Sequence, residues 1–310
     1  MLIAPQRASY QSSMHLQVRD RRIAFPRRPL IMGIVNINDD SFCGDGTLDP
    51  QAALAQAKQM AADGADIIDA GAESARTNRA AITIDEEVAR LASFVTTYQI
   101  WSREAAAQPA PWDEHQLWPP LLSLNTWRPE VVAAVLPLGG HLLNDIGALP
   151  DDRNARLCAR HSVALLIMHS VGLPKEKHTH IGYPDIMEEL DRFFEAKLKL
   201  CQAAGLPLES IILDPGIDFA KQKDDNLTIF RELQRLAHFD RPVLLPVSRK
   251  TVVGEVLNLP DPLDRDAGTL ACIARGLSTG AHLFRVHNVR AAAEAVKVLW
   301  AVETSMLTPA

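Results

Sequence analysis

The sequence predicts a single-domain α/β protein of the (β/α)8 TIM-barrel class, and three observations lead to that prediction. Short apolar runs recur along the chain, longer segments of helical period separate them, and a polar or glycine-containing turn follows each run. Eight such runs occur, which is the number of strands in this barrel. The runs are residues 31–37, 67–70, 121–124, 142–143, 163–168, 211–213, 243–247 and 283–286.

The 310 residues fit one barrel with short additions, because barrels of this class run to about 250 residues and beyond. We expect an N-terminal extension over residues 1–28, the barrel over 29–304 and a C-terminal tail over 305–310. The stretch 101–120 carries alanines, prolines and three tryptophans and follows neither period. It is predicted to be an extended loop or helix tail at the amino-terminal face of the barrel.

Two of the predicted helices have clear signals. In residues 183–204, apolar side chains recur at steps of three and four, and Gly205 and Pro207 follow as a stop. In residues 50–63, Asp49 can cap the helix, Pro50 occupies the first helical position and Gly64 ends it.

Composition excludes several classes of protein. The formal net charge of −6 argues against a nucleic-acid surface. Four widely spaced cysteines without a C-x-x-C pair suggest neither a disulfide framework nor a zinc site. No run approaches the roughly 20 apolar residues that cross a bilayer, and the start lacks the apolar core of a signal peptide. A cytoplasmic protein without a membrane or nucleic-acid partner is therefore expected.

Polar residues follow every apolar run, and in a barrel the carboxyl ends of the strands carry function. Asn125, Asn144 and Asp214 offer acceptors that suit a heterocycle with several N–H donors. Lys250, Arg285 and Arg76 supply cations that suit a phosphate or carboxylate group. Each residue also has a plainer interpretation.

Strand-end polar residues often only cap the next helix or satisfy turn amides. His169 and His287 can be satisfied core histidines, and Met168 can simply be part of the core. No G-x-S-x-G block and no pair of metal-ligating histidines is present in the sequence.

Five blocks of the sequence together resemble the successive signatures of the dihydropteroate synthase family. They are M-G-I-V-N-I-N-D-D-S-F at 32–42, G-A-D-I-I-D-A-G-A-E-S at 64–74, I-L-D-P-G at 212–216, S-R-K at 248–250 and R-V-H at 285–287. The resemblance extends from about residue 32 to residue 302, in order and with the expected spacing. It implies the condensation of 6-hydroxymethyl-7,8-dihydropterin pyrophosphate with p-aminobenzoate, which yields dihydropteroate and pyrophosphate in folate biosynthesis.

The resemblance also implies a role for individual residues. The residues implied for the pterin are Asn125, Asn144, Met168, Asp214, Phe219 and Lys250. Asn36, Arg285 and His287 would bind the pyrophosphate, with Asn36 also a ligand of Mg²⁺, a hard cation that prefers oxygen. Arg76, Thr77 and Thr251 would bind p-aminobenzoate, Thr251 at a helix amino terminus. Asp214, Lys250, Asn125 and Arg76 are the expected catalytic residues, and the family usually forms homodimers.

Three departures from the family pattern bear on activity. Asn125 stands where the family has a carboxylate, in S-L-N-T at 123–126. The second loop has S-A-R-T at 74–77 in place of S-T-R-P, and Asn38 stands where threonine is common. These departures put turnover, the choice of second substrate and sulfonamide sensitivity in question.

Two other functions remain open at this point. The chain could be a paralogue that binds pterin without synthase activity. It could also be a pterin-dependent methyltransferase, although such a pocket needs no pyrophosphate clamp, and Lys250, Arg285 and His287 together argue against it.

Overall fold

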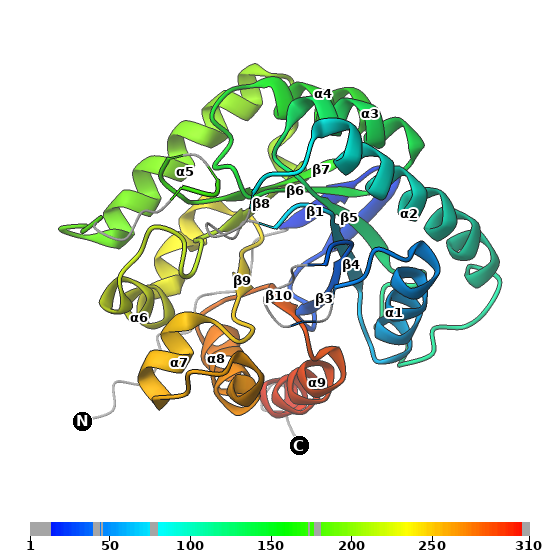
Figure 1. The fold of residues 1–310 in the computed structure, drawn as a ribbon. Helices are drawn as coiled ribbons and strands as arrows, with labels where there is room; N and C mark the ends of the chain where they lie inside the picture. Colours follow the sequence, from blue (N-terminus) through cyan, green and yellow to red (C-terminus); the bar gives the residue numbers. More distant parts are fainter. Residues whose placement is uncertain are drawn as a thin grey trace.

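The computed structural model describes residues 14–39, 44, 46–74, 80–172, 174–176 and 181–305. Within them, eight parallel strands form a nearly closed barrel surrounded by helices, as the sequence predicts (Figure 1). The barrel strands are β3 (Leu30–Asn36), β4 (Ile67–Gly71), β5 (Leu121–Asn125), β6 (Leu142–Asp145), β7 (Ala164–Met168), β8 (Ile211–Asp214), β9 (Leu244–Pro246) and β10 (Leu283–Val286). They are hydrogen-bonded in the order β8-β7-β6-β5-β4-β3-β10-β9, and a parallel bridge between Leu213 and Val243 links the two end strands.

The helices follow the strands in alternation. They are α1 (Pro50–Ala62), α2 (Ile84–Ala105), α3 (Pro129–Val135), α4 (Arg153–His161), α5 (Ile186–Ala203), α6 (Lys223–Glu232), α7 (Thr251–Leu257), α8 (Asp266–Ser278) and α9 (Val289–Ser305). The described residues also form four short 3₁₀ helices: η1 (Leu136–Leu138), η2 (Leu208–Ser210), η3 (Leu233–Phe239) and η4 (Pro262–Arg265). In the part of the chain that the structure covers, no helix is both long and apolar enough to cross a membrane.

Helix boundaries follow local capping chemistry. Asp49 caps α1 by accepting a hydrogen bond from the Gln51 N–H, and Pro50 starts the helix as expected. The helix predicted over 183–204 begins later, at Ile186. Asp185 accepts from the Met187 and Glu188 N–H groups at 2.8 and 3.1 Å, so the chain becomes helical only after this cap.

Two apolar layers hold the barrel together. The larger one packs outward-facing strand residues such as Ile68, Leu122 and Leu165 against the helices. The smaller one fills the interior with Met32, Leu166 and other inward-facing residues. Both faces of the strands are therefore buried, which explains why the strands are nearly continuous apolar runs and do not alternate.

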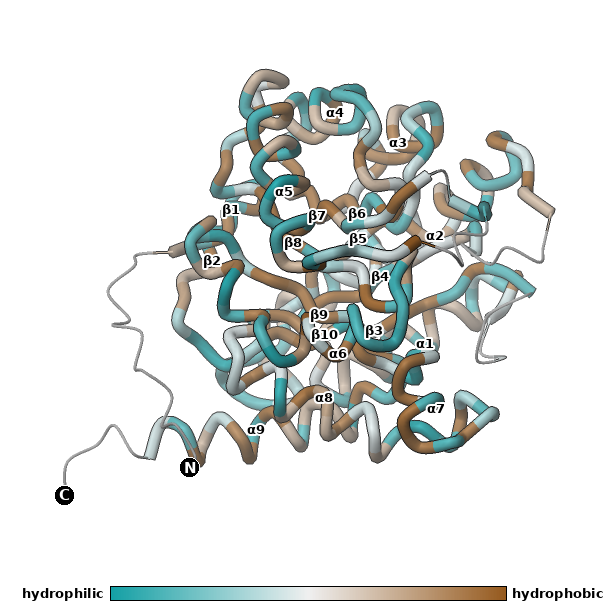
Figure 2. The backbone as a smooth tube through the Cα atoms, turned by 90° about the vertical axis from the view of Figure 1, so that its left-hand side faces the viewer, coloured by the Kyte–Doolittle hydropathy of each residue, from teal (hydrophilic) through white to brown (hydrophobic). Residues whose placement is uncertain are grey.

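A β-hairpin closes the amino-terminal end of the barrel, and the sequence analysis did not predict its strands. β1 (His15–Val18) pairs antiparallel with β2 (Arg21–Ala24), and Leu16, Val18 and Ile23 join the interior apolar layer. Figure 2 shows β1 and β2 at one end of the barrel, away from α7. Each strand has only four residues, so the alternation is too short to stand out locally.

The stretch 101–120 also lies at this amino-terminal face, as expected, although its first five residues belong to α2. The Gln116 amide donates to the carbonyls of Ala61 and Ala65 at 2.8 and 2.9 Å. The Leu117 N–H donates to the buried carboxylate of Asp66, which precedes β4. The stretch therefore helps to close the floor of the barrel and takes no part in the opposite end, called the mouth below.

Candidate active site

Strand register brings the predicted amides together at the mouth. Asn36 of β3 pairs with Gly71 of β4, Gly71 with Asn125 of β5, and Asn125 with Asn144 of β6. These four residues form one row across neighbouring strands. A side chain on Gly71 would meet Asn125 at 3.2 Å, so the glycine gives Asn125 its space.

A buried carboxylate that the sequence analysis did not single out organises this row. Asp69 of β4 is fully buried, and its Oδ2 accepts from the Asn125 amide at 3.2 Å, the Asn144 amide at 3.0 Å and Arg285 Nε at 2.8 Å. Its Oδ1 accepts from the Ser123 hydroxyl at 2.6 Å. The one available signal was a charged residue inside the apolar run Ile67–Gly71, since an unpaired carboxylate is rarely buried.

Two amide oxygens at the mouth can still accept hydrogen bonds. Asn125 and Asn144 both use their N–H₂ groups on Asp69, and neither Oδ1 has a hydrogen-bond partner among the described residues. Buried polar atoms are nearly always paired, so two orphaned amide oxygens side by side point to a ligand that donates hydrogen bonds.

Asp214 adds a third acceptor from the end of β8. Its carboxylate is 4% exposed, and its Oδ1 accepts from the Gly216 N–H at 2.7 Å. Burial raises the pKa of Asp214 to about 6, against the hydrogen bond and the charge of Lys250, which lower it. Gly216 has φ +69°, and any side chain there would collide with the His169 carbonyl, so the D-P-G turn requires glycine.

Lys250, Met168 and Phe219 surround that carboxylate. The Lys250 ammonium donates to the Ile217 carbonyl at 2.8 Å and lies 4.9 Å above the Phe219 ring. Burial lowers the pKa of Lys250. Met168 pairs with Asp214 in the strand register and is 2% exposed. Met168 therefore belongs to the interior apolar layer as well as to the wall beside Asp214.

His169 is a core histidine. It is 1% exposed, stacks edge-on against Phe193, and its Nδ1 accepts from the Lys221 ammonium at 2.8 Å. Burial lowers the pKa of His169 to about 2 and that of Lys221 to about 7. Lys221 also donates to the Phe219 carbonyl at 3.0 Å, so this pair supports the loop that carries Phe219.

The predicted anion-binding residues lie along β10 and the β9 end. Arg285 donates from its Nε to Asp69, and its side chain is part-exposed. His287 shares a hydrogen bond of 2.9 Å between its Nδ1 and the Ser248 hydroxyl, which also accepts from the His287 N–H. Arg249 instead pairs with Asp266.

Thr251 begins α7 and is exposed, but its N–H is already engaged. It donates to the Asp218 carboxylate at 2.5 Å. Arg76 and Thr77, the other residues predicted for p-aminobenzoate, lie outside the described residues.

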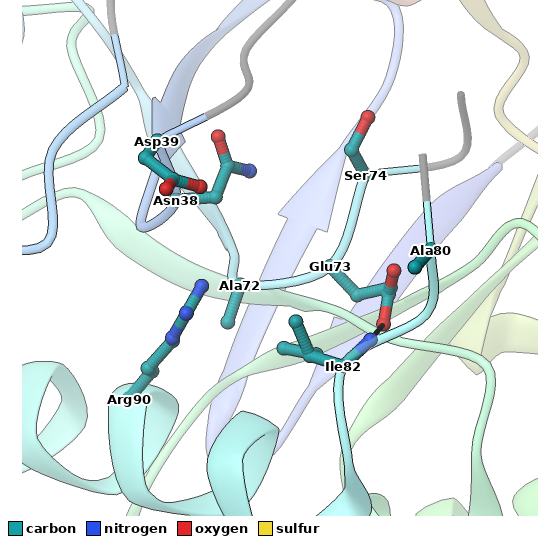
Figure 3. Close-up of a pocket in the computed structure, with 8 residues that line it drawn as sticks. All are labelled: Asn38, Asp39, Ala72, Glu73, Ser74, Ala80, Ile82 and Arg90. Carbon is teal, nitrogen blue, oxygen red and sulfur yellow. Dashed lines mark hydrogen bonds between the residues drawn. The ribbon is translucent and has the colours of Figure 1, made fainter. Parts of the chain in front are cut away.

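The second loop is tied at both described ends. The Lys175 ammonium contacts the Glu73 carboxylate at 2.5 Å and the carbonyls of Ser74 and Ala80 at 2.9 and 3.3 Å. Figure 3 shows a pocket between the segments that follow β3 and β4, in which Glu73 accepts from the Ile82 N–H. None of the strand-end acceptors described above lines that pocket, so it lies beside the mouth row.

Comparisons with known proteins agree with this geometry. Residues 32–287 match the model of the pterin binding enzyme family. The dihydropteroate synthase of Escherichia coli (strain K12) is 34% identical, over 87% of this chain and 90% of the relative. The chain belongs to the dihydropteroate synthase family.

Other members of the dihydropteroate synthase family match over most of their length. That of Bacillus subtilis (strain 168) is 32% identical over 92% of both chains. The crystal structure of the Yersinia pestis enzyme with a sulfonamide drug has a TM-score of 0.82 and 32% identity, over 94% of this chain and all of that one. The Xanthomonas albilineans enzyme with 4-aminobenzoic acid has a TM-score of 0.80 and 31% identity, over 96% of this chain and all of that one.

Proposed function

We propose that the protein is a dihydropteroate synthase, a transferase that joins 6-hydroxymethyl-7,8-dihydropterin pyrophosphate to p-aminobenzoate. The observation that carries the proposal is the set of acceptors at the mouth. The orphaned amide oxygens of Asn125 and Asn144 and the buried carboxylate of Asp214 match the N–H-rich edge of a pterin. The neighbouring Arg285 and His287 supply donors for a pyrophosphate.

The reaction needs little acid–base chemistry from the protein. The bond between the pterin methylene carbon and the pyrophosphate oxygen breaks, and its electron pair leaves with the pyrophosphate. The arylamine nitrogen attacks the resulting cation and later loses a proton to water. Asp214, fixed by the Gly216 N–H, holds the ring, and the nearby carboxylates stabilise the positive charge that develops.

Lys250 and Arg285 have separate tasks in this scheme. The Lys250 ammonium, held above Phe219, donates to the pterin carbonyl and ring nitrogen. Arg285 is oriented by Asp69 through its Nε, which leaves its two terminal amino groups for the pyrophosphate. Asp69 is thus a positioning residue for Arg285 and for both amides.

Mg²⁺ is part of the proposal. Among the described residues, no three acidic, histidine or cysteine side chains gather where they could hold a metal. Asn36 at the end of β3 offers one protein oxygen. A single such ligand fits Mg²⁺, which binds mainly phosphate oxygens and water. When bound, Mg²⁺ would neutralise charge on the leaving pyrophosphate.

A homodimer is also proposed. Val298 and Val302 lie one turn apart on α9 and are 64% and 57% exposed. Leu263 of η4, which packs against α7 and α8, is 54% exposed. Figure 1 shows α7, α8 and α9 together on one side of the barrel. Analytical ultracentrifugation should give a dimer, and Val298→Asp with Val302→Asp should shift it toward the monomer. A cytoplasmic location stays an expectation from composition.

The direct test is calorimetry of dihydropterin pyrophosphate with Mg²⁺, followed by addition of p-aminobenzoate and detection of dihydropteroate. Pterin binding without product would favour the binding paralogue. Methyl transfer from a methylated folate would favour the methyltransferase.

A further inference from the structure

Ser248 and His287 lie side by side where β9 and β10 end. The register of these strands pairs Pro246 with Arg285, so Ser248 and His287 each follow two positions later. Ser248 is 6% exposed, and its Oγ lies 2.9 Å from His287 Nδ1 and 3.1 Å from the His287 backbone nitrogen. One hydroxyl therefore contacts both the backbone and the ring of His287.

These two contacts assign the protons of the pair. A backbone N–H can only donate, so the Ser248 oxygen accepts from the His287 N–H. The hydroxyl hydrogen needs an acceptor, and Ser248 has no further hydrogen-bond partner among the described residues. Because buried polar groups are nearly always paired, the hydroxyl donates to His287 Nδ1. A neutral imidazole has a single N–H, which is then at Nε2.

The chain segments on either side of the pair are also fixed to each other. Arg249, which follows Ser248, donates from its Nε to Asp266 Oδ1 at 2.7 Å. Asn288, which follows His287, donates from its amide to Asp266 Oδ2 at 3.0 Å. Asp266 therefore bridges the two segments, and the imidazole is oriented before a ligand arrives, which lowers the entropic cost of binding.

The proposed function assigns His287 to the pyrophosphate, so the inference that follows rests on that function. Pyrophosphate oxygens accept hydrogen bonds, and an Nε2–H can donate one to them. With the proton on Nδ1, Nε2 would present a lone pair, which a negatively charged oxygen repels. The position of one proton thus decides whether His287 attracts or repels the pyrophosphate.

We propose that Ser248 is a positioning residue for the pyrophosphate. Its hydroxyl orients the His287 ring and keeps the ring proton on Nε2, so that His287 donates to a pyrophosphate oxygen. Ser248 acts through His287 and needs no contact of its own with the substrate.

The first test is NMR of the ring nitrogens in protein with isotope-labelled histidine, at about pH 8, where an ordinary imidazole is neutral. His287→Gln identifies the His287 signals by their loss. The wild type should show protonated Nε2 and bare Nδ1. Ser248→Ala should move both signals toward the average of the two tautomers, and Ser248→Thr, which keeps the hydroxyl, should restore them. Protonated Nδ1 in the wild type would overturn the inference.

The matched control is Thr269→Val. It removes another buried hydroxyl, which accepts from the Arg249 N–H at 3.0 Å next to Ser248, and nearly keeps the shape of the side chain. Thr269→Val should leave the His287 signals as they are in the wild type. The same displacement in the control would show that the signals report a general disturbance of the segment, which contradicts a specific role of Ser248.

The second test is calorimetry. Ser248→Ala should weaken dihydropterin pyrophosphate by about threefold to tenfold, the size of one neutral hydrogen bond, and leave a pterin without phosphates within about twofold. In a His287→Ala background, Ser248→Ala should cause no further loss, because its effect passes through the imidazole. An equal loss in both backgrounds, or for both ligands, would contradict the proposal.

Neither test needs turnover, so the inference can fail separately from the proposed function. If no dihydropteroate forms, the synthase assignment fails, and the affinity for inorganic pyrophosphate with Mg²⁺ takes the place of the substrate. A loss of that affinity in Ser248→Ala, with the Nε2–H tautomer in the wild type, supports the positioning role. An affinity that Ser248→Ala leaves unchanged, or a wild type that binds no pyrophosphate, excludes it.

Discussion

The two ends of the barrel are built on the same strands but differ in what the strand ends carry: packed apolar residues at the floor and polar binding groups at the mouth. At the floor, the hairpin packs Leu16 and Val18 onto inward-facing strand residues, and the polar groups of Asp66 and Gln116 are satisfied by backbone partners. At the mouth, the amide oxygens of Asn125 and Asn144 have no partner in the part of the chain that the structure describes. The floor leaves only donors such as Trp112 Nε1 without a partner among the described residues, whereas the mouth leaves two acceptors side by side. That pair of acceptors distinguishes the binding end from the stabilising end.

The largest expected difference between the ends comes from Asp214→Ala at the mouth. Pterin affinity should fall by about 3–6 kcal/mol, the sum of two charge-assisted hydrogen bonds at about 1.5–3 kcal/mol each. The free energy of unfolding should hold or rise, because a buried carboxylate with a raised pKa is removed. Calorimetry with a pterin and urea unfolding measure the two effects, and an affinity within tenfold of wild type would contradict the assignment.

At the floor, Leu16→Ala should show the reverse pattern. Leu16 is 1% exposed, so its truncation should lower the free energy of unfolding by about 2–5 kcal/mol. Pterin affinity, measured well below the lowered Tm, should stay within about twofold. An equal loss of pterin binding would show that the floor and the mouth are coupled.

Within the mouth, Arg285→Ala tests whether Arg285 binds the pyrophosphate or the pterin ring. The loss of affinity for dihydropterin pyrophosphate should exceed the loss for a pterin without phosphates by about 1.5–3 kcal/mol, one charged hydrogen-bonding group. Arg249→Ala, which removes a partner of Asp266, is the control. Equal losses for the two ligands would mean that Arg285 acts mainly on the ring.

The last difference between the ends is a pH dependence at the floor. His141 and His282 each accept a backbone N–H at Nδ1, from Leu122 and Val243, and burial lowers the pKa of both to about 4. The unfolded chain, with imidazole pKa values near 6.5, then binds more protons than the folded one between pH 6.5 and 4. The stability that the neutral imidazoles contribute is therefore lost as the pH falls through that window.

Replacing both histidines by asparagine, which keeps an acceptor, should remove this contribution. The difference in free energy of unfolding between wild type and variant should change by about 2–3 kcal/mol per imidazole from pH 6.5 to 4, in favour of the variant. Asp214 and Asp145, whose pKa values burial raises to about 6, give the opposite slope but are common to both proteins. A difference independent of pH would show that the imidazoles do not titrate in this window.

The sequence by itself determined the eight strands, their order and the polar residues at their ends. Apolar runs, caps and turns are local signals, and strand ends of parallel strands meet at one edge whatever the packing details. Asn125, Asn144, Asp214 and Lys250 could therefore be assigned to one site before any coordinates were known.

Only the tertiary structure decided which of these side chains are already paired. The contact between Arg285 and Asp69 joins residues 216 positions apart, and the Asp218 carboxylate reaches α7 across 33 positions. The hairpin likewise finds its partners on strands far along the chain. Such contacts depend on barrel closure and on the exact register, and local periodicity in a sequence carries no information about either.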